Sequence, residues 1–154
     1  VAPGATLGSL SVTGDAAFAS EARLTIELGG TVSGSFDVLA IAGVVTLGGE
    51  LRVSLTNGFT AGPADTFTIL TGSTVRGFFL NAMPPGLGNT GHLFFAGGEA
   101  DVTYHDDSVV LSNVIPEPSL PALVALGAAI VGAGRRERRR SRSGMLTNSH
   151  ANLP

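Results

Sequence analysis

The sequence predicts an all-β body followed by a single C-terminal transmembrane helix, and three observations carry this prediction. Before residue 119, apolar and polar residues alternate in short runs bounded by Gly, Asn or Asp, which is typical of half-buried strands. No stretch there keeps the period of an α-helix. An internal repeat runs through this part, and an uncharged apolar run with an arginine cluster follows it.

The repeat determines the expected architecture. When the sequence is aligned with itself after a shift of one repeat, Leu10 aligns with Leu39 and Arg23 aligns with Arg52. A unit of this length cannot bury its own apolar face, so neighbouring units must stack. We therefore expect a right-handed parallel β-solenoid. The alternative is a β-sandwich of antiparallel hairpins, because several of the expected turns are very short.

Residues 1–113 are expected to form this β-solenoid domain. Its clearest strand candidates are residues 10–13, 24–28, 44–47, 51–55 and 67–70. Proline and glycine residues predict a loop over 81–89. The chain begins at Val1 without a signal peptide, so we expect a fragment that lacks an upstream export signal. It has no cysteine, which excludes disulfide and thiolate chemistry.

The stretch 114–142 combines three unlike pieces. Pro116, Glu117 and Pro118 come first, and an apolar run follows. We expect a transmembrane helix over 119–134, whose apolar run at 120–134 is marginal in length at about 22 Å against a hydrocarbon core of ~30 Å. Six arginines close the stretch: Arg135, Arg136, Arg138, Arg139, Arg140 and Arg142. Residues 143–154 are expected to form a disordered tail.

Charge orients the expected span. Residues 1–114 carry three arginines and ten acids, a net charge of −7, whereas residues 115–154 carry six arginines and two acids, a net charge of +4. The positive-inside rule therefore places the arginine end in the cytoplasm. The alternatives are a buried core helix and an arginine patch that binds nucleic acid. No aromatic residue accompanies the arginines, so we expect no nucleic-acid partner.

The order of Pro-Glu-Pro, short apolar helix and arginine cluster resembles the PEP-CTERM sorting signal. The resemblance implies a Gram-negative bacterium that produces exopolysaccharide. It also implies processing by an exosortase, a membrane-embedded cysteine transpeptidase-like enzyme. Pro116, Glu117 and Pro118 would then be the sorting and processing motif, and the six arginines would stop transfer and fix the topology. The chain departs from the pattern because 143–154 follow the arginines.

The body is similar to autotransporter-associated β-strand repeats. Residues 39–55 (LAIAGVVTLGGELRVSL) carry the similarity, and residues 57–60, 65–70 and 75–79 continue it. This resemblance implies the passenger β-helix of secreted bacterial surface proteins. It therefore also implies an extracellular structural or adhesive module.

Candidate chemistry in the body is sparse. Asp101, His105, Asp106 and Asp107 could hold a divalent cation, or form a turn with exposed acids between two strands. His92 is expected in a glycine-rich loop with no evident partner. No grouping of nucleophile and base stands out, so no catalytic residue, metal or cofactor is predicted.

Glutamate and arginine also recur two positions apart in the repeats, as Glu21–Arg23 and Glu50–Arg52. Such neighbours share one face of a strand. Stacked repeats could therefore align the two pairs in a charge ladder, which would contribute little stability per pair at the surface.

Two classes of function remain. The first is an exported, non-enzymatic surface or extracellular-matrix protein, anchored transiently in the inner membrane with its C-terminus in the cytoplasm. Its expected partners are an exosortase-type membrane transpeptidase and membrane lipid, with exopolysaccharide as a further candidate. The alternative is a β-helix polysaccharide-acting enzyme or an adhesin fragment. The three arginines and absent lysines before residue 114 disfavour an enzyme that binds polysaccharide.

Overall fold

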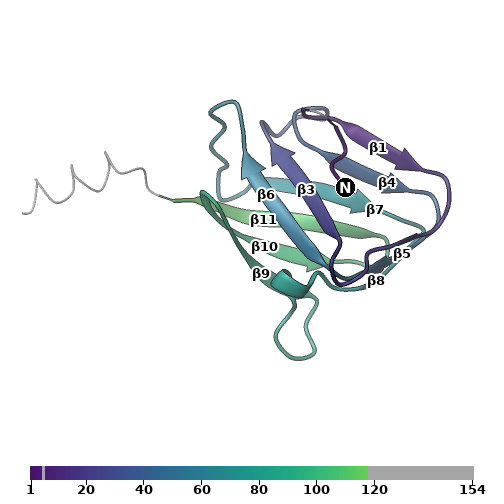
Figure 1. Cartoon of the computed structure of the whole chain (residues 1–154). Coiled ribbons are helices and arrows are strands. Elements are labelled where there is room, and N and C mark those ends of the chain that lie inside the picture. Colours follow the sequence, from purple (N-terminus) through teal and green to yellow (C-terminus); the bar gives the residue numbers. More distant parts are fainter. Residues whose placement is uncertain (5, 118–154) are drawn as a thin grey trace, which may run out of the picture. The chain divides into compact units, whose positions relative to one another are not determined.

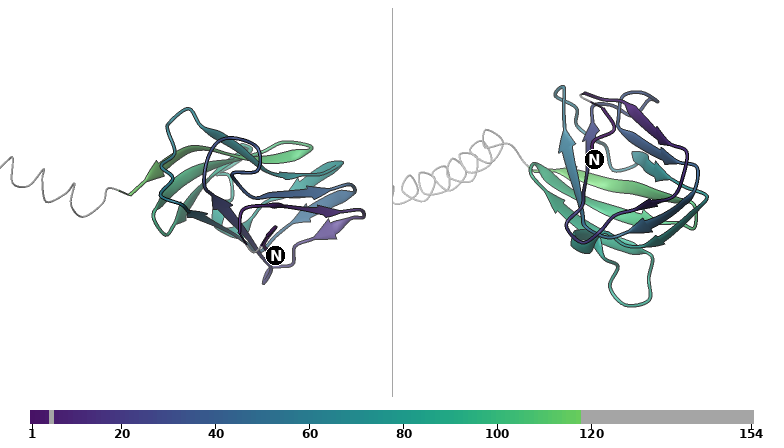
Figure 2. Two further views of the ribbon diagram at one scale, coloured as in Figure 1. Left: turned by 90° about the horizontal axis from the view of Figure 1, so that it is seen from above. Right: turned by 45° about the vertical axis from the view of Figure 1, so that its right-hand side comes forward.

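The computed structural model describes residues 1–4 and 6–117, which are mostly β and include no α-helix (Figure 1). The predicted all-β class is therefore confirmed. One 3₁₀-helix, η1 (Leu80–Ala82), precedes a loop at 83–89 that extends away from the sheets (Figure 2). The strands are β1 (Ser9–Val12), β2 (Ala16–Ala17), β3 (Arg23–Leu28), β4 (Val38–Ile41), β5 (Val44–Leu47), β6 (Glu50–Leu55), β7 (Thr66–Thr71), β8 (Thr74–Gly77), β9 (Thr90–Phe95), β10 (Gly98–Tyr104) and β11 (Ser108–Pro116).

Strands β1 to β8 stack in parallel with their counterparts one repeat later (Figure 1). β1 pairs with β4, which pairs with β7; β2 pairs with β5, which pairs with β8; and β3 pairs with β6. Leu10 lies opposite Leu39, as the repeat predicts. The repeated sequence therefore corresponds to a repeated structural unit in this part of the body.

The register of β3 on β6 differs from the predicted one. Arg23 lies opposite Glu50 and not opposite Arg52, which is two positions further along the strand. A shift by two positions keeps every side chain on the same face, so the apolar pattern cannot distinguish the two registers. The corner before β6 decides between them, because Gly49 adopts a φ of +64° and makes that corner short.

The C-terminal part of the body is antiparallel, a feature that the repeat does not predict. β11 pairs with β7 on one side and with β10 on the other, and β10 pairs with β9. The result is a mixed six-stranded sheet with the order β1-β4-β7-β11-β10-β9. This sheet joins the repeats to the last strand before the expected sorting motif.

One apolar core lies between the sheets. Strand alternation supplies most of it: in β3, the side chains of Leu24, Ile26 and Leu28 are fully buried and the residues between them are not. Phe67 and Phe79 are the largest fully buried side chains. Replacing such a residue by alanine typically costs about 3–5 kcal/mol, so the packing of these rings holds the sheets together.

Asp37 is the only buried charged residue among those the structure describes. Its carboxylate accepts the N–H groups of Gly8 at 2.8 Å and Glu27 at 3.0 Å. Asp37 also donates its own N–H to the Glu27 carbonyl at 2.9 Å. Asp37 thereby satisfies both backbone groups of Glu27 on the outer edge of β3, the N–H through its carboxylate and the carbonyl through its own N–H.

Within residues 1–4 and 6–117, no helix combines the length and apolar character needed to cross a membrane. The expected transmembrane helix at 119–134 and the expected tail at 143–154 lie outside the described residues. Pro118 and the six C-terminal arginines lie outside them as well.

Candidate functional site

The first two residues of the expected sorting motif lie at the end of the folded body. Pro116 is the last residue of β11 and lies opposite Gly98 of β10. The N–H of Glu117 donates to the carbonyl of Gly97 at 2.9 Å. Glycine is required at position 98, because a Cβ there would collide with the Ile115 carbonyl oxygen. The turn between β9 and β10 thus holds the chain up to Glu117.

The first compact unit of the chain runs from Val1 to Glu117. Val114 is buried in the core, and β11 continues through Ile115 and Pro116. The expected boundary at residue 113 therefore falls inside a strand. The structural boundary follows Glu117, between the second and third residues of the Pro-Glu-Pro motif.

The acids considered for a cation site do not converge. Asp101 lies on β10, whereas residues 105–107 form the turn between β10 and β11. The carbonyls of Asp106 and Asp107 accept N–H groups from Val75 and Gly72. No group of three or more metal-ligating side chains occurs among the described residues. In the described structure, this turn acts through its backbone, which joins the hairpin to β8 and the segment before it.

His92 has partners that the sequence did not reveal. Its Nδ1 lies 3.0 Å from Asp101 Oδ1, and its Nε2 lies 3.3 Å from Glu99 Oε2. Both acids come from β10, which pairs with β9 across a tight turn. The hydrogen bond to Asp101 raises the pKa of His92, against an opposing effect of desolvation, and the hydrogen bond to Glu99 raises it further. Counting outward from the Ala96–Gly97 turn would have placed His92 opposite Asp101.

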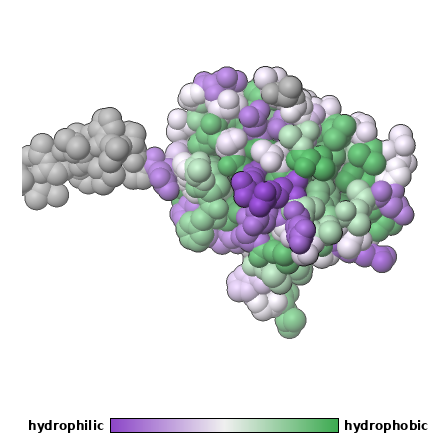
Figure 3. Space-filling model, in the orientation of Figure 1, coloured by the Kyte–Doolittle hydropathy of each residue, from purple (hydrophilic) through white to green (hydrophobic). Residues whose placement is uncertain are grey.

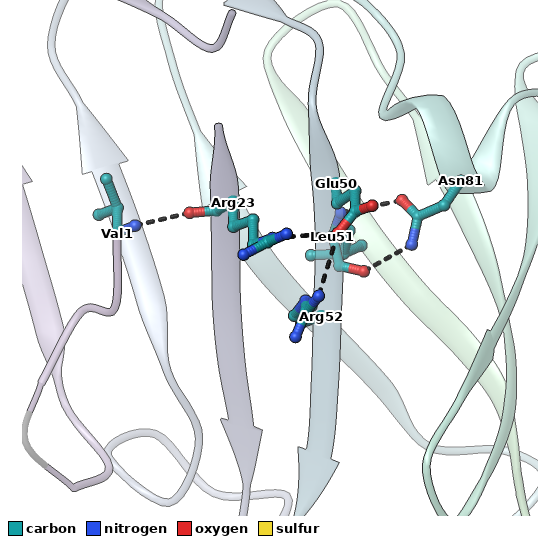
Figure 4. A network of polar contacts seen from close by, with 6 residues as sticks. All are labelled: Val1, Arg23, Glu50, Leu51, Arg52 and Asn81. Atoms are coloured by element: carbon teal, nitrogen blue, oxygen red, sulfur yellow. Dashed lines mark hydrogen bonds and ion pairs between the residues drawn. The ribbon is translucent and has the colours of Figure 1, made fainter. Parts of the chain in front are cut away.

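A charge cluster joins β3 and β6 on the outer face of the body (Figure 4). Glu50 Oε2 lies 3.2 Å from Arg23 Nε and 3.3 Å from Arg52 Nη2. Hydrogen bonds from Arg23 and then Arg52 lower the pKa of the Glu50 carboxyl. The expected charge ladder is therefore present in part: Glu50 bridges two repeats, while Glu21 precedes β3 and makes no ion pair in the described structure.

The surface around this cluster is hollowed on two sides. A groove of about 300 Å³ is lined by Glu50, Arg52, Val53 and Phe94, among other residues. A second hollow of about 460 Å³ is lined by Ser20, Glu21, Arg23 and Glu50. Figure 3 shows a hydrophilic patch near the centre of this face, bordered by hydrophobic surface.

Asn81 also lines the first groove. Its side-chain amide accepts the N–H of Leu51 at 2.9 Å and donates to the Leu51 carbonyl at 2.8 Å (Figure 4). Sequence reasoning placed Asn81 in a loop and gave it no role. Its position in η1, directly after the last parallel strand, brings it to the edge of β6.

In the described structure, Glu50 is paired with two arginines and His92 with two carboxylates. Comparisons with family models, with curated proteins and with solved structures find no match to this chain. Function is therefore inferred from the sequence motif and from the geometry of these surfaces.

Proposed function

We propose that the protein is an exported, non-enzymatic surface or extracellular-matrix protein whose C-terminal signal directs sorting and processing by an exosortase. The observation that carries the proposal is the order of three pieces: the motif at 116–118, the apolar run before residue 135 and the six arginines. A single span with its arginines in the cytoplasm accounts for this order and for the opposite charges of body and tail.

The position of the motif supports processing at this point. The compact unit ends at Glu117, so a cut after the motif would release the whole folded body. Pro116 fixes its own φ, and Pro118 disfavours a helical conformation at Glu117. Proteases bind their substrates extended, and Pro116, the first residue of the motif, belongs to the extended strand β11. Glu117 is the only charge between Asp107 and Arg135, which suits recognition by a cationic group at the membrane surface.

We further propose that the repeats form a short β-solenoid that serves as a structural or adhesive module. Parallel pairing of three successive repeats supports this architecture, because Leu39 lies opposite Leu10 of the preceding repeat and opposite Leu70 of the following one. Exopolysaccharide is a proposed partner outside the cell.

Mass spectrometry of protein recovered from a host with an exosortase tests the processing step. Wild-type chains should end near residues 115–118, and Glu117→Ala should prevent this cut. The variant keeps the backbone N–H that bonds to Gly97, so the end of β11 is retained. Glu21→Ala, at an exposed glutamate outside the motif, is the matched control and should be processed normally. Surface material that retains peptides beyond Arg142 in both wild type and Glu117→Ala would contradict the proposal.

A further inference from the structure

Exposed apolar side chains gather in η1 and in the loop that follows it, which together form an apolar segment, residues 80–89. Leu80 is 52% exposed, Met83 is 55% exposed and Leu87 is fully exposed. The loop at 83–89 extends away from the sheets, and hydrophobic surface covers its tip (Figures 2 and 3). Apolar side chains grouped on a surface in this way mark a site of interaction with a protein or a membrane.

The apolar segment carries no charge, although the body around it is strongly acidic. Between Arg76 and Glu99 the only titratable side chain is His92, whereas residues 1–117 as a whole contain eleven acids and three arginines. Pro84 and Pro85 have no backbone N–H. The loop therefore has fewer groups that lose hydrogen bonds to water when its tip enters an apolar environment.

The two polar side chains of the apolar segment are bound to the body. Asn81 makes two hydrogen bonds to the backbone of Leu51. Asn89 donates from its side-chain amide to the Tyr104 carbonyl at 3.1 Å. The tip of the loop, from Met83 to Gly88, consequently meets its surroundings with apolar side chains and backbone alone.

Tyr104 of β10 holds both ends of this loop. Its hydroxyl donates to the Ala82 carbonyl at 3.0 Å, and its backbone N–H donates to the Asn89 carbonyl at 2.8 Å. Gly91 lets β9 begin close to η1, because a Cβ there would collide with the Ala82 carbonyl oxygen. The base of the loop is therefore fixed to the sheet, which lowers the entropy that its tip would lose on binding.

We propose that the loop at 83–89 docks on the lipid surface of the membrane in which the chain is anchored. Met83 and Leu87 enter the boundary between headgroups and acyl chains, while the backbone of the loop stays in the hydrated interface. Protein interfaces usually include direct hydrogen bonds and charged or aromatic side chains, none of which the tip offers from its side chains. A lipid surface requires neither. This inference rests on the proposed membrane anchor.

Anchoring makes so small a contact sufficient. A few apolar side chains bind a free membrane weakly, but a body tethered to the bilayer meets its surface at a high effective concentration. A cut at the motif removes the tether and leaves only the weak contact. The loop therefore holds the body against the membrane before processing and releases it afterwards.

The chain has no tryptophan, so a single introduced tryptophan reports its own position. The full chain with Leu87→Trp, reconstituted in phosphatidylcholine vesicles, should lose emission when the vesicles include a lipid with a nitroxide near its headgroup. Val32→Trp, at an exposed apolar residue outside the apolar segment, is the matched control and should keep its emission. Adding Met83→Asp to Leu87→Trp should remove the quenching, because a carboxylate does not enter the apolar part of the interface.

The outcomes separate the docking from the anchor. A chain that sediments with the vesicles but keeps the emission of Leu87→Trp would overturn the docking and leave the anchor intact. A chain that does not sediment with the vesicles would contradict the anchor, and this inference with it. Emission of Leu87→Trp that shifts to shorter wavelength with protein concentration, without quenching by the labelled lipid, would overturn the proposal by assigning the loop to a second copy of the chain.

Discussion

Asn81 takes the place of a neighbouring strand at Leu51: one side-chain amide makes both backbone hydrogen bonds, at 2.9 and 2.8 Å. In the described structure, the third repeat contains no strand to follow β6, and η1 lies there instead. A primary amide has donor and acceptor groups in the geometry of a peptide group, so it can cap a strand edge at a single residue.

Replacing Asn81 by alanine should therefore destabilise the body. The substitution leaves both partly buried backbone groups of Leu51 without their protein partner, at a cost of about 1–3 kcal/mol. Urea denaturation followed by circular dichroism measures the change. Thr60→Ala, at an exposed residue with no side-chain hydrogen bond in the described structure, should change stability by less than about 0.5 kcal/mol. Equal stability of both variants would show that solvent replaces the Asn81 amide fully.

His92 should make the stability of the body depend on pH. Hydrogen bonds to Asp101 and Glu99 raise its folded pKa above the ordinary value of 6.5. The stabilisation is complete below pH 6.5 and is lost as pH rises through the raised folded value. Urea titrations at a series of pH values give the free energy of unfolding of wild type and of His92→Gln. The difference between these two free energies should shrink as pH rises across this range. His105→Gln controls for the loss of a histidine; the same pH trend in that variant would exclude His92 as the cause.

Tyr104 should remain protonated well into the alkaline range. Its hydroxyl donates to the Ala82 carbonyl at 3.0 Å and accepts the Phe79 N–H at 3.2 Å. Burial raises the pKa of Tyr104 to about 12, partly offset by the bond from Phe79. The folded state should therefore lose stability as pH rises from about 10 through 12.

The absorbance of tyrosinate reports the titration of Tyr104 alone, because the chain has a single tyrosine. The transition should lie near pH 12 while the body stays folded and shift toward about 10 in urea. A folded chain that titrates with the ordinary pKa would show that water reaches this hydroxyl.

Duplication of one repeat tests the proposed solenoid. A second copy of the segment 14–42, inserted after Ala42, adds one repeat that should stack in parallel on its neighbours. The longer chain should unfold cooperatively with a urea m-value about a quarter larger, because buried area grows with chain length. The inserted sequence in scrambled order is the control. An unchanged m-value with sharp loss of stability would indicate that the repeats cannot extend.

The repeat predicted the stacking of β1 on β4, because Leu10 and Leu39 share both sequence context and spacing from the next corner. The repeat placed Arg23 two positions away from its observed partner, because a shift by two positions leaves the side-chain alternation unchanged. The corner before β6, which contains Gly49, is shorter than the corresponding corner before β3. The antiparallel strands after η1 carry no copy of the repeat, so its period could not place them.

The polar sites were harder to predict than the strands. The pairs Glu21–Arg23 and Glu50–Arg52 were expected to align in a ladder, but the shifted register places Arg23 opposite Glu50, so Glu50 contacts both arginines and Glu21 contacts neither. The partners of His92 depend on how β9 folds back on β10, which a glycine-rich sequence does not specify until the turn is known. The role of Asn81 depends on the absence of a strand on the edge of β6 opposite β3 in the described structure, for which no pattern in the sequence gives a signal.

The two-sided pairing of β11 has a mechanical consequence. Its residues bond to β7 on one side and to β10 on the other, and Glu117 directly follows its C-terminal end at Pro116. Tension applied at Glu117 along the strand therefore strains many hydrogen bonds together, in shear, and does not open them one after another. Forced unfolding is governed by the rate of crossing the unfolding barrier, so a body held by this end resists steady pulling better than one held by an edge strand.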